Sequence, residues 1–423
     1  MLHQLKKMIP RPALQAYHYV LAKTAEAVYR HPSEKLIVIG VTGTNGKSST
    51  VNFIAQILTN LGETVGYTST AGFSIAGKEV ENKMKMTMPG RFYLQNILGE
   101  MVKAKCSYAI IETSSQGLDQ FRHLGINYDV AVFTNLTPEH IEAHGGFDNY
   151  RKAKGKLFEH LTARRKKRLE GHDVPKTIVV NSDDEHAAYF ASFPADRRVS
   201  FSFADKLIRV GDVAHPVDKL PLRAEFEQKN ALAAIATVES LGFPLKRVMD
   251  AASLLRPLAG RFEKIDQGQP FMVIVDYAYE PYALEALFDA VKGSRLIGVH
   301  GSAGGGRDIA RRPIIGKLAG EYEAVVIVTN EDPYDEDPRE IIEAVARGAQ
   351  EAGKVEGTDL FLVDDRKEAI KKAFSLAEAG DVVLLTGKGS EPVMAVAGGK
   401  KIAWDDRKVA RELLGEMGYH KSV

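Results

Sequence analysis

A glycine-rich loop that follows a strand-like run constrains this chain more than any other feature. The loop spans residues 40–50, reads GVTGTNGKSST, and lies between a β-branched run at 35–41 and a helical pattern. In such a position Gly43 and Gly46 let the backbone curl, so that successive N–H groups and the N-terminus of the next helix face phosphate oxygens. The order of strand, loop and helix therefore predicts a nucleotide-binding loop rather than a plain glycine-rich turn.

The residues around Gly46 supply the chemistry that a nucleotide needs. Lys47 would reach the outer phosphates, and Ser48 would place its hydroxyl on a magnesium ion. The spacing differs from the common Walker pattern, because Thr44 and Asn45 fill a shorter loop. We therefore expect a nucleotide to bind here together with magnesium.

Short β-branched runs alternate with longer helical patterns, which predicts an α/β fold with parallel sheets covered by helices. The expected strands cover 35–41, 108–112, 130–134 and 177–181, and then 272–276, 296–300, 324–329, 359–363 and 381–386. Pro257 cannot continue the helical stretch before it, so we place a hinge at Arg256 and Pro257. The expected division is a helical segment over 1–34, a central domain over 35–257 and a second domain over 258–423.

Composition excludes several classes of protein. The chain is 44% hydrophobic and 26% charged, as in ordinary globular proteins. Its 56 Lys and Arg residues balance 55 Asp and Glu residues, so the net charge of +1 predicts no nucleic-acid partner. The single cysteine, Cys106, can form neither an internal disulfide nor a zinc cluster. Without a signal peptide or an apolar run long enough to span a bilayer, we expect a cytoplasmic protein.

Two segments have simple interpretations. Residues 1–30 are basic and carry Leu14, Tyr17, Val20, Leu21 and Val28 at helical spacing. We interpret them as a helix packed on the first domain, with a weak interfacial membrane contact as the alternative. The basic stretch at 164–168 is expected to be a charged surface loop.

Further motifs follow the loop in a characteristic order. They are IETSSQGL at 111–118, TNLTPEH at 134–140, NALAA at 230–234, GRFE at 260–263, DYA at 276–278, GGGRD at 304–308 and GKGSE at 387–391. With the loop, they resemble the Mur ligase family, and most of all its UDP-N-acetylmuramoyl-tripeptide synthetase branch. The resemblance implies a central P-loop ATPase domain with a mainly parallel sheet and a C-terminal Rossmann-like ligase domain.

The resemblance also implies a reaction. Such enzymes use ATP to phosphorylate a substrate carboxylate, and an amine then displaces phosphate from the acyl phosphate to leave an amide. The expected partners are a cell-wall precursor, similar to a UDP-MurNAc-dipeptide, and an amino acid, with the enzyme acting as a monomer. A related ligase on a folylpolyglutamate-type or lipid-linked acceptor, or a nucleotide-binding protein that ligates nothing, remains an alternative.

Two residues are candidate metal ligands. Glu112 ends an apolar strand, so its carboxylate should lie at the carboxyl edge of the sheet, where a hard cation or only solvent could meet it. His140 follows Thr137 and Pro138, which should start a short helix, and a lone histidine is usually structural. The resemblance assigns Glu112 and His140 to a second magnesium ion.

A helix around 150–158 carries the next candidate. Its lysines look like a basic solvated face, but the resemblance singles out Lys154, because His144, Tyr150 and Lys154 match the spacing of a family motif. In that motif the final lysine is carbamylated and binds magnesium, whereas Lys152 and Lys156 are expected to be ordinary surface charges. A carbamate offers a hard cation anionic oxygen ligands, which an ammonium cannot do.

The resemblance assigns the remaining candidates by position. The nucleotide would contact Gly43, Thr44, Asn45, Gly46, Lys47, Ser48, Ser49, Asn230, Arg261 and Asp276, with Asn230 near the base. The acceptor would contact Thr87, Ser114, Ser115 and Arg122. The incoming amino acid would contact Arg307, Glu331, Asp332 and Glu391.

The chain also departs from the family pattern. Residues 1–34 are too few for the N-terminal UDP-binding domain of such enzymes, and Met88 and Tyr279 replace a threonine and a histidine of two motifs. Diaminopimelate enzymes carry Asp-Asn-Pro-Arg where this chain has EDPY at 331–334. The lost arginine, and up to three acidic side chains near Arg307, predict a lysine- or ornithine-like substrate.

Overall fold

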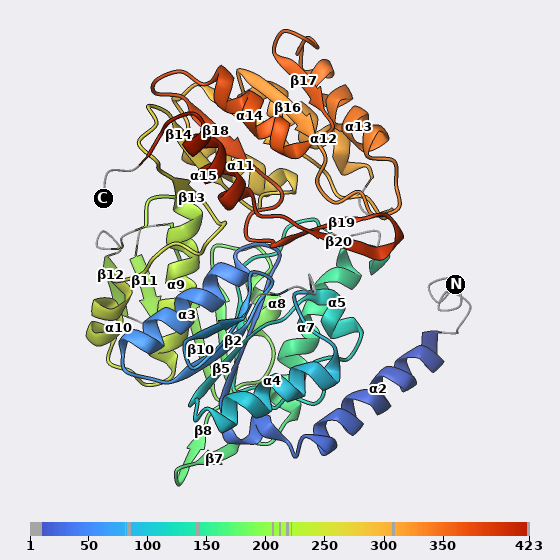
Figure 1. The fold of residues 1–423 in the computed structure, drawn as a ribbon. Coiled ribbons are helices and arrows are strands. Elements are labelled where there is room, and N and C mark those ends of the chain that lie inside the picture. Colours follow the sequence, from blue (N-terminus) through green and yellow to red (C-terminus); the bar gives the residue numbers. More distant parts are fainter. Residues whose placement is uncertain are drawn as a thin grey trace. The chain divides into compact units, whose positions relative to one another are not determined.

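The computed structural model describes residues 11–80, 82, 86–139, 144–204, 207–210, 213–216, 220, 222–306 and 309–420. The chain forms two compact units, Met1–Arg256 and Pro257–Val423 (Figure 1). Each expected strand is present, with ends that differ by at most two residues. The α/β fold class is therefore confirmed. The prediction succeeded because runs of β-branched residues are a reliable signal for strands.

An eight-stranded sheet forms the centre of the first unit. Its order is β10-β9-β6-β1-β5-β2-β3-β4, parallel from β10 to β2 and antiparallel from β2 to β4. The bounds are β1 (Ile37–Thr42), β2 (Val65–Thr68), β3 (Phe73–Ile75), β4 (Lys78–Val80), β5 (Tyr108–Glu112), β6 (Val130–Phe133), β9 (Thr177–Asn181) and β10 (Arg197–Phe201). A small hairpin of β11 (Leu207–Val210) and β12 (Val213–Pro216) accompanies it.

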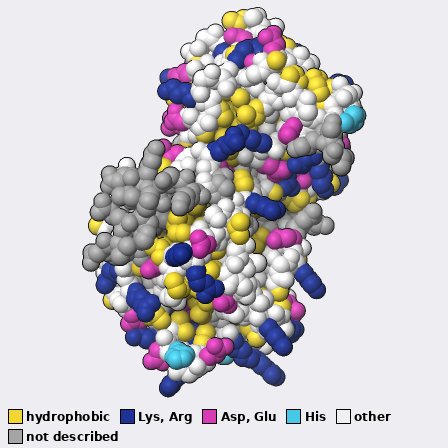
Figure 2. All heavy atoms as spheres, turned by 90° about the vertical axis from the view of Figure 1, so that its left-hand side faces the viewer, with side chains coloured by type: hydrophobic (Ala, Val, Ile, Leu, Met, Phe, Trp, Pro, Cys, Tyr) yellow, Lys and Arg dark blue, Asp and Glu magenta, His cyan; other side chains and the backbone are white. Residues whose placement is uncertain are grey.

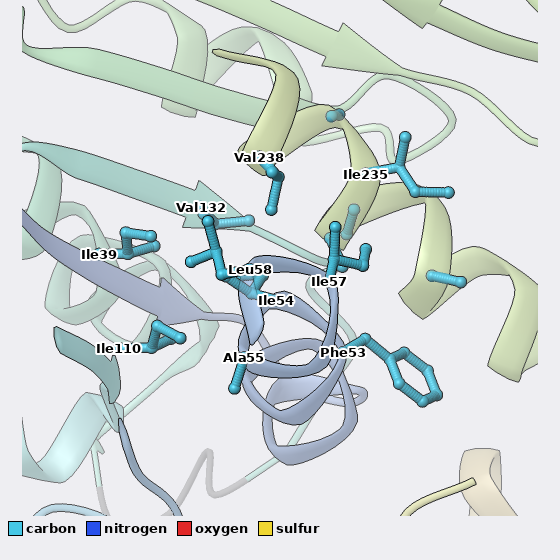
Figure 3. Packing of buried hydrophobic residues seen from close by; sticks show 14 of the residues in the cluster. Ile39, Phe53, Ile54, Ala55, Ile57, Leu58, Ile110, Val132, Ile235 and Val238 are labelled. Atoms are coloured by element: carbon cyan, nitrogen blue, oxygen red, sulfur yellow. The ribbon is translucent and has the colours of Figure 1, made fainter. Parts of the chain in front are cut away.

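Helices cover both faces of this sheet, because alternate strand residues point to opposite sides. Ile39 and Val41 pack with α3 (Lys47–Asn60), α9 (Glu225–Ser240) and α10 (Leu245–Ala252), as Figure 3 shows for part of the cluster. Val38 belongs to the opposite core. That core includes buried residues of α4 (Arg91–Lys103), α5 (Ser115–Asp119), α7 (Phe147–Ala163) and α8 (Ala187–Ala191).

The N-terminal helix α2 (Arg11–Val28) packs beside α4 and leads into a 3₁₀ turn at Pro32–Lys35. Its buried residues are Ala22, Ala25 and Glu26, whereas Tyr17 and Val20 are more than half exposed. The helix is confirmed, but of the apolar residues expected to pack only Leu14 and Leu21 are half-buried, whereas Tyr17, Val20 and Val28 are exposed. Small side chains allow the close approach, and the Glu26 carboxylate accepts a hydrogen bond from Arg164 (2.6 Å).

The expectation of a charged surface loop at 164–168 is correct for the exposed Arg165 and Lys166 but wrong from Lys167 on. Lys167 begins β7 (Lys167–Leu169), which pairs with β8 (His172–Val174) in a hairpin. The ammonium of Lys167 is buried and lies 2.5 Å from the carboxylate of Asp129, which Lys176 also approaches. A buried charge needs such a partner, so this lysine anchors the hairpin to the sheet.

The second unit has a six-stranded sheet of order β13-β14-β18-β15-β16-β17, parallel except for β13. The strands are β13 (Glu263–Ile265), β14 (Met272–Val275), β15 (Leu296–His300), β16 (Val325–Thr329), β17 (Leu360–Val363) and β18 (Val382–Leu385), and β19 (Val393–Val396) pairs with β20 (Lys400–Ala403). The helices are α11 (Pro281–Ala290), α12 (Arg311–Tyr322), α13 (Pro338–Glu351), α14 (Arg366–Leu376) and α15 (Asp406–Glu416), with a 3₁₀ turn at Ala397–Gly399.

The surface carries charged side chains of both signs (Figure 2). On the face in Figure 2, side chains of both charges are interspersed with apolar ones, as expected for a net charge of +1. Among the described residues, none of the helices is both long and apolar enough to cross a membrane.

Candidate active site

The glycine-rich loop joins β1 to α3 and packs tightly against two other elements. Gly46, at φ 78°, caps α3 in the left-handed region that favours glycine. A Cβ atom on Gly46 would lie 2.0 Å from Oδ1 of Asn230 on α9, and one on Gly43 would lie 1.9 Å from Oγ1 of Thr134. Asn230, expected near the base, thus lies against the loop itself.

Asn135, the second residue after β6, fixes the shape of the loop. Its carbonyl accepts the N–H of Thr44, and its Oδ1 accepts the N–H of Asn45, both at 2.8 Å. Its Nδ2 donates to the carbonyl of Asn45 (3.1 Å). The N–H groups of Thr44 and Asn45 therefore form hydrogen bonds within the protein. The N–H groups in the first turn of α3, which begins at Lys47, have no acceptor within the helix and could bind phosphate oxygens.

A chain of hydrogen bonds leads from α3 to the expected acceptor residues. Glu112, buried at the end of β5, accepts from Ser48 Oγ (2.8 Å), the N–H of Thr70 (2.7 Å) and Thr70 Oγ1 (3.1 Å). Thr70 Oγ1 also lies 2.8 Å from Thr87 Oγ1. Sequence reasoning missed Thr70, because it follows β2, which was not among the expected strands.

Ser48 and Glu112 fit a magnesium ion, since a hydroxyl and a carboxylate are the hard oxygen ligands that it prefers. Among the described residues, no three His, Cys, Asp or Glu side chains gather as a complete metal site. Phosphate oxygens and water would therefore complete the shell. Lys47 Nζ donates to the carbonyl of Thr44 (2.6 Å), so the lysine stays beside the loop.

Lys154 is 1% exposed on α7, and its ammonium reaches the same loop. Nζ donates to the carbonyl of Gly43 (2.5 Å) and lies 4.4 Å from the ring centroid of Tyr150. No described carboxylate lies within 4.0 Å of Nζ, whereas burial and the charge of Lys47 hold the pKa of Lys154 well below its ordinary value of 10.5. Glu139 and Glu112 oppose this shift from a greater distance.

His144 and Lys156 meet at Asp119, the last residue of α5. Nδ1 of His144 lies 2.8 Å from Asp119 Oδ2, and its Nε2 lies 3.1 Å from Ser115 Oγ. Burial would raise the pKa of Asp119, but hydrogen bonds from His144 and Lys156 lower it. Lys156 is therefore a paired, two-thirds-buried lysine rather than the ordinary surface charge that we expected. His140 lies outside the described residues.

The expected acceptor residues come together around Met88. Ser114 caps α5 and accepts the N–H of Gly117 (3.2 Å), where a Cβ atom would lie 2.6 Å from Met88 Sδ. Arg122 donates to the carbonyl of Met88. Gly117 of α5 and Arg122 therefore both lie against Met88 in the segment before α4, and Thr87 is adjacent to Met88 in the chain.

In the second unit, Asp276 holds a turn and Arg261 lies over an aromatic ring. The carboxylate of Asp276 accepts the N–H groups of Phe262 (2.6 Å) and Ala278 (2.7 Å), and burial raises its pKa although Arg261 opposes the shift. The guanidinium of Arg261 lies 4.2 Å from the ring centroid of Tyr277. Arg307 lies outside the described residues.

The expected amino-acid site contains a positive charge, Lys388, that the sequence analysis did not include among the charges of this site. Lys388 is fully buried, and its Nζ donates to both carboxylate oxygens of Asp332 (3.0 Å each) and to Glu391 (2.8 Å). Among the residues that the structure describes, Oε2 of Glu331 has no hydrogen-bond donor. Burial, with Asp332 nearby, raises the pKa of Glu331 to about 7. The GKGSE motif contained Lys388, but nothing in the spacing placed it between two acids.

Comparison with known proteins shows which family the chain is similar to. Residues 41–238 match the Mur ligase middle domain, and 260–389 match the model described as Mur ligase, glutamate ligase domain. A UDP-N-acetylmuramyl-tripeptide synthetase of Roseiflexus sp. is 38% identical over 97% of this chain and 85% of its own length. The chain belongs to the Mur ligase family. Mur ligases are ATP-dependent amide ligases.

Two further Mur ligases are similar over most of the chain. A UDP-N-acetylmuramoyl-L-alanyl-D-glutamate–2,6-diaminopimelate ligase of Geobacillus kaustophilus is 35% identical over 94% of this chain and 83% of its own length. A solved structure of a ligase with the same name is 27% identical, with a TM-score of 0.57 over 90% of this chain and 79% of that one.

Proposed function

We propose that this Mur ligase joins an amino acid to the terminal carboxylate of a UDP-N-acetylmuramoyl-dipeptide-type acceptor. The observation that carries the proposal is the hydrogen-bonded series Ser48, Glu112, Thr70 and Thr87. It connects the end of the phosphate loop to the residues expected to hold the acceptor. A carboxylate beside Thr87 would lie on the same edge of the sheet as the terminal phosphate.

The reaction has two balanced steps. An acceptor carboxylate oxygen attacks the terminal phosphorus of ATP, the bond to ADP breaks, and an acyl phosphate forms. The amine of the incoming amino acid then attacks the acyl carbon, phosphate leaves with the bonding electrons, and the nitrogen loses a proton. Lys47 would neutralise the outer phosphates during the first step. A magnesium ion held by Ser48 and Glu112 would supply charge stabilisation there.

We further propose that Lys154 is carbamylated and, with Glu112 and His140, holds a second magnesium ion. Its Nζ is buried beside the loop, no carboxylate of the described residues pairs with it, and its spacing from His144 and Tyr150 supports the same proposal. The amine nitrogen would attack carbon dioxide, form an N–C bond and lose a proton. The resulting carbamate would replace a costly buried cation by an anionic oxygen ligand.

The incoming amino acid should carry a side-chain ammonium. After the pairing of Lys388 is counted, Glu331 is a buried acid with one oxygen that has no donor within the described part of the chain, and a cation beside it would gain an ion pair. Tyr334 stands where diaminopimelate enzymes carry arginine, so a second substrate carboxylate would lack a partner. We propose L-lysine or L-ornithine as the substrate, with Arg307 holding its α-carboxylate.

The test supplies UDP-N-acetylmuramoyl-L-alanyl-D-glutamate, ATP and magnesium with L-lysine, L-ornithine or meso-diaminopimelate, and measures phosphate release and product mass. We expect a tripeptide product, with diaminopimelate disfavoured by more than about 100-fold. Preference for diaminopimelate would refute the amino-acid assignment and leave the ligase assignment standing. Absence of product with every amino acid, while a folate or lipid-linked acceptor is used, would refute the acceptor.

A further inference from the structure

One face of the N-terminal helix α2 is exposed and carries no charged side chain. Figure 1 shows α2 in dark blue beside α4, which it contacts. Residues three and four positions apart lie on the same side of a helix, and on α2 this spacing connects seven exposed residues. We call them the α2 stripe, and they are Ala13, Ala16, Tyr17, Val20, Thr24, Ala27 and Val28.

The α2 stripe is not the face that holds the helix to the protein. Ala22, Ala25 and Glu26 are buried, whereas Val20 is 59% exposed. The solvated face of a surface helix normally carries charged and polar side chains. A continuous exposed apolar face marks an interaction site, whereas single exposed apolar residues need no explanation.

The charges that border the α2 stripe are positive. Lys23 follows Val20 by three positions and precedes Ala27 by four, so its partly exposed side chain lies along the edge of the stripe. Glu26 is the one acid in the sequence of α2. Its buried carboxylate is paired with Lys23 and Arg164, so it contributes little negative charge to the surface.

More cations lie where α2 ends. Arg30 and Lys35 are exposed in the segment that leads from α2 to β1. Arg165, which is 81% exposed, lies 3.7 Å from the half-buried carboxylate of Glu34 in the same segment. The helix therefore combines an uncharged exposed face with an end at which exposed cations outnumber acids.

The dimensions of the helix argue against a second copy of the chain as the partner. An α-helix of 18 residues is about 27 Å long, and with its side chains it is about 10 Å wide. A second copy that covered the stripe alone would bury about 270 Å² on each side, against about 800 Å² in a stable protein interface. The cations of two copies would also repel each other, whereas an anionic lipid surface carries the opposite charge and extends beyond the helix.

We propose that the α2 stripe is a peripheral contact surface for an anionic lipid bilayer. The side chains of Val20 and Val28 and the ring of Tyr17 enter the headgroup region, and Lys23 and Arg30 face the lipid phosphates. The packing of α2 on the protein persists, because it uses the opposite face. This inference goes beyond the proposed function and does not depend on it.

The test measures how the full chain partitions onto vesicles by sedimentation. One set of vesicles contains equal parts of phosphatidylcholine and phosphatidylglycerol, and the other contains phosphatidylcholine alone. We expect binding to the anionic vesicles to be at least about 10-fold stronger and to weaken as salt is added. The double variant Val20→Asp, Val28→Asp should lower this binding at least about 10-fold, because it removes apolar contact and adds negative charge.

The matched control is Val355→Asp, which changes a 58% exposed valine of the second unit and should leave vesicle binding unchanged. Equal binding to the two kinds of vesicle, binding to neither, or an equal loss in the control would overturn the inference. A dimer that the double variant dissociates, without vesicle binding by the wild-type chain, would overturn it in favour of a second copy. Phosphate release with a soluble acceptor should be the same in the double variant and the wild-type chain, so failure of ligation concerns the proposed function alone.

Discussion

Replacing Glu331 by glutamine should stabilise the second unit at high pH while it impairs the use of the amino acid. In the folded chain the pKa of Glu331 is about 7, against an ordinary value of 4.5. Between these values the folded protein holds a proton that the unfolded chain has lost. Stability from this group is therefore fully present below pH 4.5 and falls as pH rises to 7. A shift of this size corresponds to about 3 kcal/mol at most above pH 7.

Glutamine cannot ionise, so the variant lacks that penalty. The assay is urea unfolding at pH 5 and pH 8, followed by fluorescence of Trp404, which is the one tryptophan of the chain and lies in the second unit. We expect Glu331→Gln and the wild-type protein to differ little at pH 5, with the variant more stable by as much as about 3 kcal/mol at pH 8.

The matched control is Glu285→Gln, which removes an exposed carboxylate from α11 of the same unit. It should leave the change between the two pH values as in the wild-type protein. If Glu331→Gln is equally or less stable at pH 8 relative to pH 5, burial of an ionisable Glu331 is not the cause and the reasoning fails. Unimpaired use of L-lysine by the same variant would contradict its role toward the substrate ammonium.

Three further predictions concern the first unit. Lys47→Ala should raise the activation free energy of turnover by at least about 3 kcal/mol, because the charge on the outer phosphates is lost. Near-normal phosphate release by this variant would contradict the phosphate-loop assignment. Lys154→Ala should abolish turnover with unchanged circular dichroism, and added short carboxylates should partly restore it, whereas full activity would exclude an essential carbamate. Burial would raise the pKa of Glu26, but hydrogen bonds from Lys23 and Arg164 outweigh it and lower this pKa to about 2. The ionised carboxylate therefore stabilises the fold above pH 4.5, and this contribution is lost as the pH falls toward 2. Urea unfolding of Glu26→Gln should show a free energy of unfolding lower by up to about 3 kcal/mol above pH 4.5, and a smaller difference near pH 2.

Local sequence signals predicted the strands, and the place of the glycine-rich loop between a strand and a helix, well. Each expected strand is a short β-branched run, and in the first unit such runs are buried on both faces of the sheet. The loop's glycines could be interpreted because the left-handed backbone at Gly46 is a local requirement, whereas its close contact with Asn230 could not be predicted. Glu112 was predicted at the sheet edge for a similar reason, since it directly ends β5.

Long-range partners could not be predicted in the same way. Lys167 resembled a surface charge until Asp129, 38 residues earlier, proved to be its buried partner. Lys388 likewise neutralises two acids, although one of them, Asp332, lies 56 residues away. The packing of α2 through Ala22 and Ala25 also escaped prediction, because a hydrophobic pattern does not show that small residues allow a closer approach.

The double contact between the Asn135 side chain and Asn45 has a thermodynamic consequence. The amide holds the N–H and the carbonyl of one loop residue at once, so the loop's conformation is set by the protein rather than by a ligand. Little conformational entropy then remains to be lost when a nucleotide enters. Asn135→Ala should therefore weaken nucleotide binding through an entropic penalty, although Asn135 need not touch the nucleotide at all.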